Sequence, residues 1–190
     1  MTFNRSGLAA VLSLALSSTA LVAAPVALAT AEKTVEVGGA PMYPSKNIIQ
    51  NAVNSKDHTT LVAAVKAAGL VETLSGPGPF TVFAPTNAAF EKLPAGTVET
   101  LLKPENKATL TKVLTYHVLA GKMSAADIVK AIEAGGGKAT LATVEGGALT
   151  AELHDGGVML TDEAGGMAMV TIADVDQSNG VIHVVDTVLM

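Results

Sequence analysis

The sequence predicts an α+β domain in which several helices pack against an antiparallel sheet. Two observations carry this prediction. Helical patterns fill the chain from about residue 46 to residue 134, whereas the part beyond residue 137 consists of short apolar runs between pairs of glycines. Because helix-rich and strand-rich segments follow one another instead of alternating, the order is typical of α+β folds.

Residues 1–29 are predicted to be a signal peptide. Arg5 gives a short positive segment, Leu8–Ala24 is apolar, and Ala27–Leu28–Ala29 provides small residues at a cleavage site. The alternative is a retained membrane anchor, but the apolar run is short for a span and Pro25 breaks it. We therefore expect cleavage near Ala29 and Thr30, and a secreted or periplasmic product.

The segment after the cleavage site is predicted to be an extended linker. Residues 30–45 contain Gly38, Gly39 and two prolines. The domain itself is expected to run from Lys46 to Met190, a length that suits one domain with its own core.

Six helices are predicted from apolar spacing and from residues that start or end helices. Val53 belongs to the apolar stripe of the first, Asp57 or Thr59 can cap the second, and Gly69 stands at its end. Thr86 is the expected N-cap of the third. The six are expected within residues 46–55, 57–70, 86–92, 96–102, 105–114 and 124–134.

The strands are predicted from short apolar runs bounded by turn residues. "FTVFAP" is one, and it stops at Pro85. "TYHVLAG", which contains Tyr116 and His117, is interpreted as a second. Glycine pairs at 146–147, 156–157 and 165–166 separate further strands that are expected to form hairpins.

The final run, "NGVIHVVDTVLM", is apolar on both faces, which predicts a strand covered on both sides. His183 and Asp186 are three residues apart, so strand alternation points them to opposite faces and excludes a shared ion or a direct relay. Tyr116 and His117 are expected to point apart for the same reason. We expect His117 and His183 to be buried, neutral and hydrogen-bonded, and His58 and His154 to be solvated.

Composition excludes several functions. The formal net charge is −5, and Arg5 is the only arginine. An acidic domain without arginine is a poor nucleic-acid binder. The chain has no cysteine, so it has no disulfide, no thiol nucleophile and no cysteine-linked lipid anchor.

No catalytic, cofactor-binding or metal-binding residue is expected. The sequence lacks the G-x-S-x-G, phosphate-loop and H-E-x-x-H motifs. The segment Asp174–Gly180 begins like a calcium loop. However, Asn179 stands where such a loop needs glycine, and Val185 stands at its twelfth position in place of glutamate.

Three segments together resemble the fasciclin (FAS1) domain family. They are "GPFTVFAPTNAAF" at residues 78–90, "LTYHVLAG" at residues 114–121 and "NGVIHVVDTVLM" at residues 179–190. The chain is most similar to the bacterial secreted single-domain type. The resemblance implies an α+β fold in which a β wedge or sandwich of about seven strands packs with several helices.

The resemblance also implies a non-enzymatic interaction module in cell-surface adhesion or matrix association. Its partner would be a protein, matrix or cell-surface component. Tyr116 and His117 match the Tyr-His pair of the family, and Asp174 and Val175 occupy the place of its Asp-Ile motif. With His183 and Asp186 they form the candidate interaction or fold-bracing set. Two alternatives stay open, a carrier of an apolar pigment or lipid and a metal-dependent hydrolase using His117 and His183.

Overall fold

The computed structural model describes residues 34–190, so the predicted signal peptide and its cleavage site lie outside the described residues. Two 3₁₀ turns lie at Lys56–His58 and Pro104–Asn106. The helices are α1 (Ile48–Ala52), α2 (Thr59–Ala68), α3 (Val71–Ser75), α4 (Asn87–Glu91), α5 (Thr97–Leu101), α6 (Lys107–Tyr116) and α7 (Ala125–Ala134). The strands are β1 (Val35–Val37), β2 (Ala40–Met42), β3 (Phe80–Pro85), β4 (Val118–Ala120), β5 (Lys138–Ala142), β6 (Ala148–His154), β7 (Gly157–Thr161), β8 (Met167–Gln177) and β9 (Gly180–Val185).

Seven strands form one mixed sheet in the order β4-β3-β9-β8-β7-β6-β5. The expected antiparallel pairing holds except between β3 and β9, which run in parallel from Phe80↔Gly180 to Pro85↔Val185. Leu119 of β4 bridges to Thr143, which follows β5, and Val144 N donates to Val118 O at 2.8 Å. The sheet therefore folds back until its two edge strands meet at one corner.

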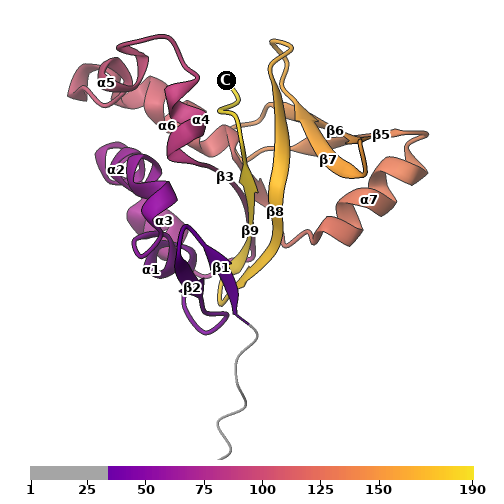
Figure 1. Cartoon of the computed structure of the whole chain (residues 1–190). Coiled ribbons are helices and arrows are strands. Elements are labelled where there is room, and N and C mark those ends of the chain that lie inside the picture. Colours follow the sequence, from indigo (N-terminus) through magenta and orange to yellow (C-terminus); the bar gives the residue numbers. More distant parts are fainter. Residues whose placement is uncertain (1–33) are drawn as a thin grey trace, which may run out of the picture. The chain divides into compact units, whose positions relative to one another are not determined.

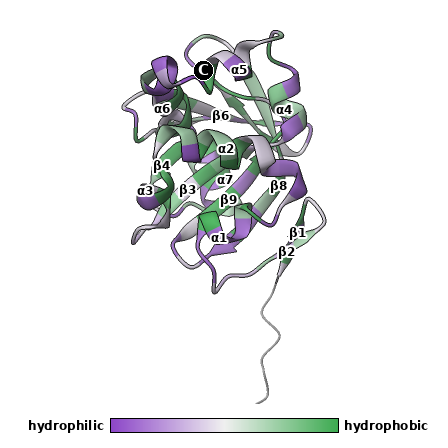
Figure 2. Cartoon of the chain, turned by 90° about the vertical axis from the view of Figure 1, so that its left-hand side faces the viewer, coloured by the Kyte–Doolittle hydropathy of each residue, from purple (hydrophilic) through white to green (hydrophobic). Residues whose placement is uncertain are grey.

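The last strand, β9, lies at the centre of this arrangement and is buried along its whole length. Ile182 and Val184 pack into the core beneath α1, α2 and α6, whereas Val185 packs into the second core beneath α7. Figure 1 shows α1–α6 on one side of β9 and α7 with β5–β7 on the other, and Figure 2 looks onto the helical side. The prediction of a strand covered on both faces is confirmed for Gly180–Val185, but it is wrong for residues 186–190, which lie beyond the strand.

Two of the predicted helix ends are confirmed, at Gly69 and Thr86, and two predictions about helix ends are wrong. Gly69 ends α2 at φ 78°, and Thr86 caps α4 by accepting from Ala89 N at 3.3 Å. The predicted cap of α2 is wrong, because the Asn87 side chain from another helix accepts from Thr60 N at 3.0 Å. Val53, expected on a buried stripe, is 50% exposed because α1 ends at Ala52.

The linker predicted over residues 30–45 is wrong for residues 35–42. β1 and β2 form a hairpin whose residues Val37 and Met42 are buried in the first core. Gly38 and Gly39 make its two-residue turn at φ 60° and 72°, a conformation that favours glycine. The packed domain therefore begins before Lys46. Within residues 34–190 no helix has the length and apolar character needed to cross a membrane.

Candidate functional site

His183 is a buried brace between three segments. Its Nδ1 accepts from Asp174 N at 3.3 Å, and its Nε2 lies 2.9 Å from Met123 O. This pattern requires a neutral ring with the proton on Nε2, since Nδ1 must keep its lone pair. The Phe83 ring lies 5.6 Å from it, centroid to centroid. Burial lowers the pKa of His183, which favours the neutral form.

His117 is a second buried brace, and its ring is in the opposite tautomer to that of His183. Its Nδ1 lies 2.7 Å from Val113 O and its Nε2 accepts from Leu189 N at 3.1 Å, so the proton sits on Nδ1. Burial lowers the pKa of His117. Both nitrogens of His117 and of His183 are therefore used by backbone groups, and the two rings share no partner.

Tyr116 and His117 do not lie in a strand, which corrects the interpretation of "TYHVLAG". Helix α6 continues through Tyr116, His117 is its C-cap, and β4 begins only at Val118. The buried residues Leu110, Leu114 and His117 recur at helical spacing, which keeps one face of this turn against the core. The two side chains nevertheless diverge, because successive helical residues also leave in different directions.

Tyr116 ties α6 to the β5–β6 region. Its hydroxyl donates to Ala148 O at 2.8 Å and accepts from Glu163 N at 3.3 Å. The ring lies against Gly147, where a Cβ would come within 2.6 Å of Tyr116 Cε2. Burial raises the pKa of Tyr116. The hydroxyl is thus occupied by the fold, and only part of the ring remains available to a groove.

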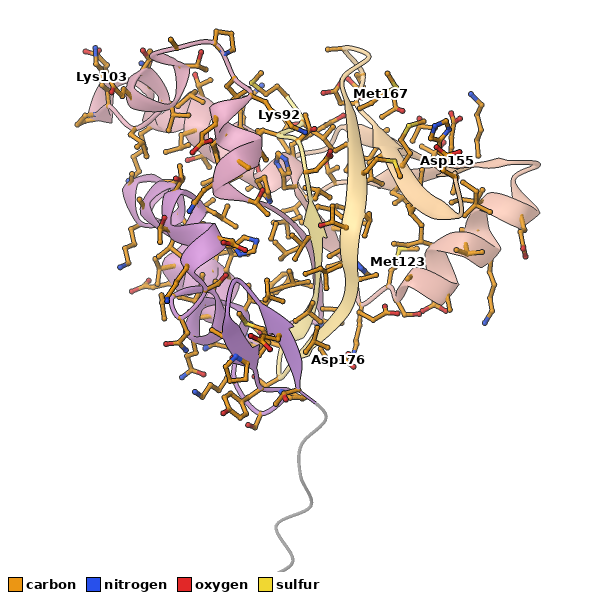
Figure 3. The ribbon with its side chains drawn as sticks, in the orientation of Figure 1. Lys92, Lys103, Met123, Asp155, Met167 and Asp176 are labelled. Carbon is orange, nitrogen blue, oxygen red and sulfur yellow. The ribbon has the colours of Figure 1, made fainter. Side chains whose placement is uncertain are left out.

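Asp174 lies on an irregular part of β8, where the pairing with β9 shifts between Ile172 and Val175. Its φ is 56°, and its Oδ1 accepts from Ala125 N at 2.7 Å at the first residue of α7. Val175 is buried in the first core, so it cannot meet a partner. Asp176, which pairs with Lys122 at 2.6 Å, is exposed at the lower end of β8 (Figure 3).

Asp186 is a separate anchor just beyond β9. Its Oδ1 accepts from Met169 N at 2.8 Å, and its Oδ2 pairs with Lys92 Nζ at 3.0 Å. Burial acts to raise the pKa of Asp186, but hydrogen bonds from Met169, Lys92 and Thr187 outweigh it and hold the pKa below its usual value. Asp186 and His183 share no hydrogen-bond partner in the described structure.

His58, expected to be solvated, is buried and bonds to Ser55 Oγ at 2.8 Å. Its Nε2 makes no hydrogen bond of good geometry. Burial lowers the pKa of His58, and the nearby backbone of Ala84 opposes part of that lowering. Other buried polar side chains escaped the sequence analysis; among them, Asn51 donates to Gln177 Oε1 across the core.

The described surface is hollowed beside Tyr116. A groove of about 370 Å³ lies between α5, α6 and the C-terminal residue; we name it the Tyr116 groove. Leu101 and Val113 supply apolar surface, and Lys112 and Glu145 form an ion pair at 3.4 Å on its rim. Its residues are Thr97, Leu101, Thr109, Lys112, Val113, Tyr116, Glu145, Glu163 and Met190.

Two small, mostly apolar cavities lie deeper, between the helices and the sheet. Each has a volume of about 30 Å³, and Leu61 and Val82 line both. Ligand pockets are usually at least about 300 Å³, so neither cavity fits a pigment or a lipid. Within residues 34–190 no three histidine, aspartate or glutamate side chains converge as metal ligands.

The wedge-like sheet with its helical cover, braced by His117 and His183, defines a known class. The chain belongs to the fasciclin (FAS1) domain family, whose domain model matches residues 56–190. The FAS1 domain pair of the insect cell adhesion molecule Fasciclin I has the same fold, with a TM-score of 0.69 and 19% identity. That match covers 78% of this chain and 52% of the insect chain.

Two curated relatives are similar over most of this chain. Protein sll1483 of Synechocystis sp. is 50% identical over 93% of this chain and 92% of its own length. The cell surface glycolipoprotein MPB83 of Mycobacterium bovis is 37% identical over 73% of this chain and 58% of its own length. The proteins similar to this chain thus include a cell surface glycolipoprotein and a cell adhesion molecule.

Proposed function

We propose that the protein is an exported, non-enzymatic interaction module that attaches to a cell-surface or matrix component. The Tyr116 groove is the surface through which it binds. The groove, about 370 Å³ and open along the rim formed by Lys112 and Glu145, is the observation that carries the proposal. Apolar floor and charged rim are the usual composition of a protein-binding surface.

Family membership supports this function over the two alternatives. MPB83 is named for the cell surface, and Fasciclin I, which has the same fold, is named as a cell adhesion molecule. The two cavities between the helices and the sheet, of about 30 Å³ each, are too small to enclose a pigment or a lipid. The nitrogens of His117 and His183 are engaged by backbone groups, which leaves a hydrolase no histidine ligand pair.

Export is the first part to test. Cleavage between Ala29 and Thr30 should give a mature protein outside the cytoplasm, because an apolar segment precedes the small residues of the site. N-terminal sequencing of the protein from its native host, after fractionation, measures this. An intact Met1 on the extracytoplasmic protein would contradict the cleavage.

Binding is tested with a matched pair of charge reversals. Lys112→Glu removes the rim ion pair of the groove, whereas Lys103→Glu removes the Lys103–Glu105 pair, at 4.0 Å, outside it. Both lysines are largely exposed, at 75% and 57%, so each pair contributes about 1 kcal/mol or less to folding. We expect saturable binding of the wild-type protein to envelope or matrix fractions, and weaker binding for Lys112→Glu alone. If both variants bind equally well, the Tyr116 groove is not the binding surface.

A further inference from the structure

Three methionines lie on one face of the hairpin formed by β7 and β8. Met159 and Met169 are directly opposite each other in the pairing, and Met167 is opposite Thr161. Met167 and Met169 are two residues apart on β8, so they point to the same side of the sheet. The register therefore brings three thioether side chains together from two adjacent strands.

This face is the one turned away from the core. The intervening pair, Leu160↔Ala168, points the other way and is buried against α7 and β6. Met167 is 59% exposed, and Figure 3 shows it at the upper end of β8. Met159 and Met169 are half-buried. We name Met159, Met167 and Met169 the methionine face.

The three side chains are within reach of one common atom. Directly opposite residues have Cβ atoms about 5 Å apart and diagonal neighbours about 7–8 Å apart, still within reach of long side chains. Methionine is unbranched with three rotatable bonds, so its sulfur can swing toward a neighbour. Gly157, two residues before Met159, has no side chain, and a Cβ there would lie 3.3 Å from Met169 Cε. Met169 therefore extends beside Met159 toward Gly157, and its terminal methyl points away from Met167. Sharing one ion requires the flexible side chain of Met167 to swing toward Met169.

Core packing does not account for the methionine face. An exposed sheet position is usually filled by threonine or by a charged residue, as at Thr150 and Glu152 on the neighbouring strand. Of the six methionines within residues 34–190, only Met42 contributes to a core as a fully buried residue. Met167 is exposed and gains little from the hydrophobic effect, and Met159 and Met169 are only half-buried, so their shared placement is compatible with a ligand.

Thioether sulfur is a soft, uncharged ligand that selects soft metal ions, above all Cu⁺. It needs no deprotonation, unlike a thiol or an imidazolium, and it binds Mg²⁺ and Zn²⁺ poorly. The carboxylate of Glu152 is opposite Met159 in the pairing, where it reduces the cost of bringing a cation to the sheet. Glu152 itself is paired with Lys138 at 2.8 Å, on the far side from the methionines.

We propose that the methionine face is a binding site for one Cu⁺ ion, held by the sulfur atoms of Met159, Met167 and Met169. The site is built by β7 and β8 and shares no residue with the Tyr116 groove. If no ion binds at the methionine face, the proposed adhesion function is therefore unaffected.

Ag⁺ is the probe, because it has the same charge and ligand preference as Cu⁺ and needs no reductant. The purified full chain, labelled with ¹³C at the methionine methyl groups, is titrated with Ag⁺ and followed by NMR and calorimetry. We expect one Ag⁺ per chain and shifts at Met159, Met167 and Met169, with Met42 and Met123 unchanged. Zn²⁺ and Mg²⁺ should move none of these signals.

Leucine replacements locate the site. Leucine keeps the volume of methionine, so Met159→Leu, Met167→Leu and Met169→Leu preserve the sheet. We expect each to weaken Ag⁺ binding about tenfold or more, and the triple variant to abolish it. Met123→Leu is the control and should bind as the wild-type chain does.

Two outcomes overturn the proposal. One is Ag⁺ binding that the triple variant retains, and the other is a set of shifts confined to Met190 or Met1. Met167→Leu is decisive even if the half-buried sites perturb folding, since Met167 is exposed and its loss leaves the core unchanged.

Discussion

His117 and His183 show how a buried neutral imidazole can join two backbone segments. Each ring offers one donor and one acceptor on opposite sides, and each serves backbone groups from two separate segments. His117 thereby ties α6 to Leu189, and His183 ties β9 to both Met123 and Asp174. These two residues of the Tyr-His and final-strand motifs hold the fold together and face no solvent.

His117→Ala should lower the free energy of unfolding by about 1–3 kcal/mol, because it leaves Leu189 N buried without a partner and removes packing. Urea denaturation should show an earlier midpoint. His154→Ala is the matched control, since His154 is 58% exposed and should leave the midpoint within about 0.5 kcal/mol. An unchanged midpoint for His117→Ala, together with lost binding, would make the residue a ligand contact.

Among the elements, the irregular stretch of β8 has the clearest role. Asp174 adopts a left-handed φ of 56° that re-aims its carboxylate from the sheet onto the first turn of α7. Bulges often redirect a side chain in this way. The strand thus positions the helix that covers the second core.

Asp174→Ala should destabilise the domain by about 1–2 kcal/mol, because it removes a helix cap and puts alanine in a left-handed conformation. Asp174→Asn keeps both an acceptor oxygen and tolerance of that conformation, so it should be nearly neutral. Thermal melting of the two variants compares them directly. An equal loss of stability in both variants would show that the negative charge of Asp174 matters more than its acceptor oxygen and its left-handed conformation.

Residues 185–190 form a second structural element that the domain needs. Val185, Val188 and Leu189 are buried, and Met190 N donates to Asp162 Oδ2 at 3.0 Å. Deleting residues 185–190 should abolish cooperative melting, since each buried side chain contributes about 2–5 kcal/mol to a total of about 5–15 kcal/mol. Circular dichroism measures this. Removing Met190 alone, which is 52% exposed, is the control and should preserve the transition.

The sequence foresaw those elements whose pattern is complete within one segment. β9 alternates between two apolar faces, and Gly69 and Thr86 mark helix ends by their own chemistry. The α2 cap could not be foreseen because Asn87 belongs to another helix. The β1–β2 hairpin was missed because its strands are three residues long, although Gly38 and Gly39 carried the turn signal.

The candidate site was foreseen less completely than the fold. The prediction that His183 and Asp186 have separate partners is confirmed, although Asp186 lies beyond β9 and strand alternation therefore does not apply to it. The Tyr116 groove depends on α5, α6 and the β5–β6 turn coming together, and no local spacing encodes that meeting. The methionine face likewise depends on the register of β7 with β8, which is fixed by the buried pair Leu160↔Ala168.

For the whole molecule, three buried histidines make stability depend on pH. Burial lowers the pKa of His58, His117 and His183, so below about pH 6.5 the unfolded chain takes up protons that the folded chain does not. Stability is therefore complete above that pH and falls as the pH decreases toward the folded pKa values. The maximal slope is about 1.4 kcal/mol per pH unit for each histidine.

Urea denaturation between about pH 7.5 and pH 5.5 measures this slope. Asp186 also has a lowered pKa, but an aspartate loses its contribution only as the pH falls below about 4, so the two effects separate. His117→Ala should show a shallower slope than the wild-type chain. A midpoint that stays constant across the range would mean that the rings protonate within the folded domain.

The position of β9 between β3 and β8 also sets the order of events during synthesis. Among the strands of residues 34–190, β9 comes last in the sequence although it lies at the centre of the sheet, and its parallel partner β3 lies about 100 residues earlier. Strands β5–β8 can pair locally as hairpins, but β3 and β4 are separated by helices α4 to α6, and neither core can close while β9 is still missing. The domain therefore stays unfolded until β9 has been made, which leaves the preceding polypeptide threadable through a narrow translocation channel for the whole of that time.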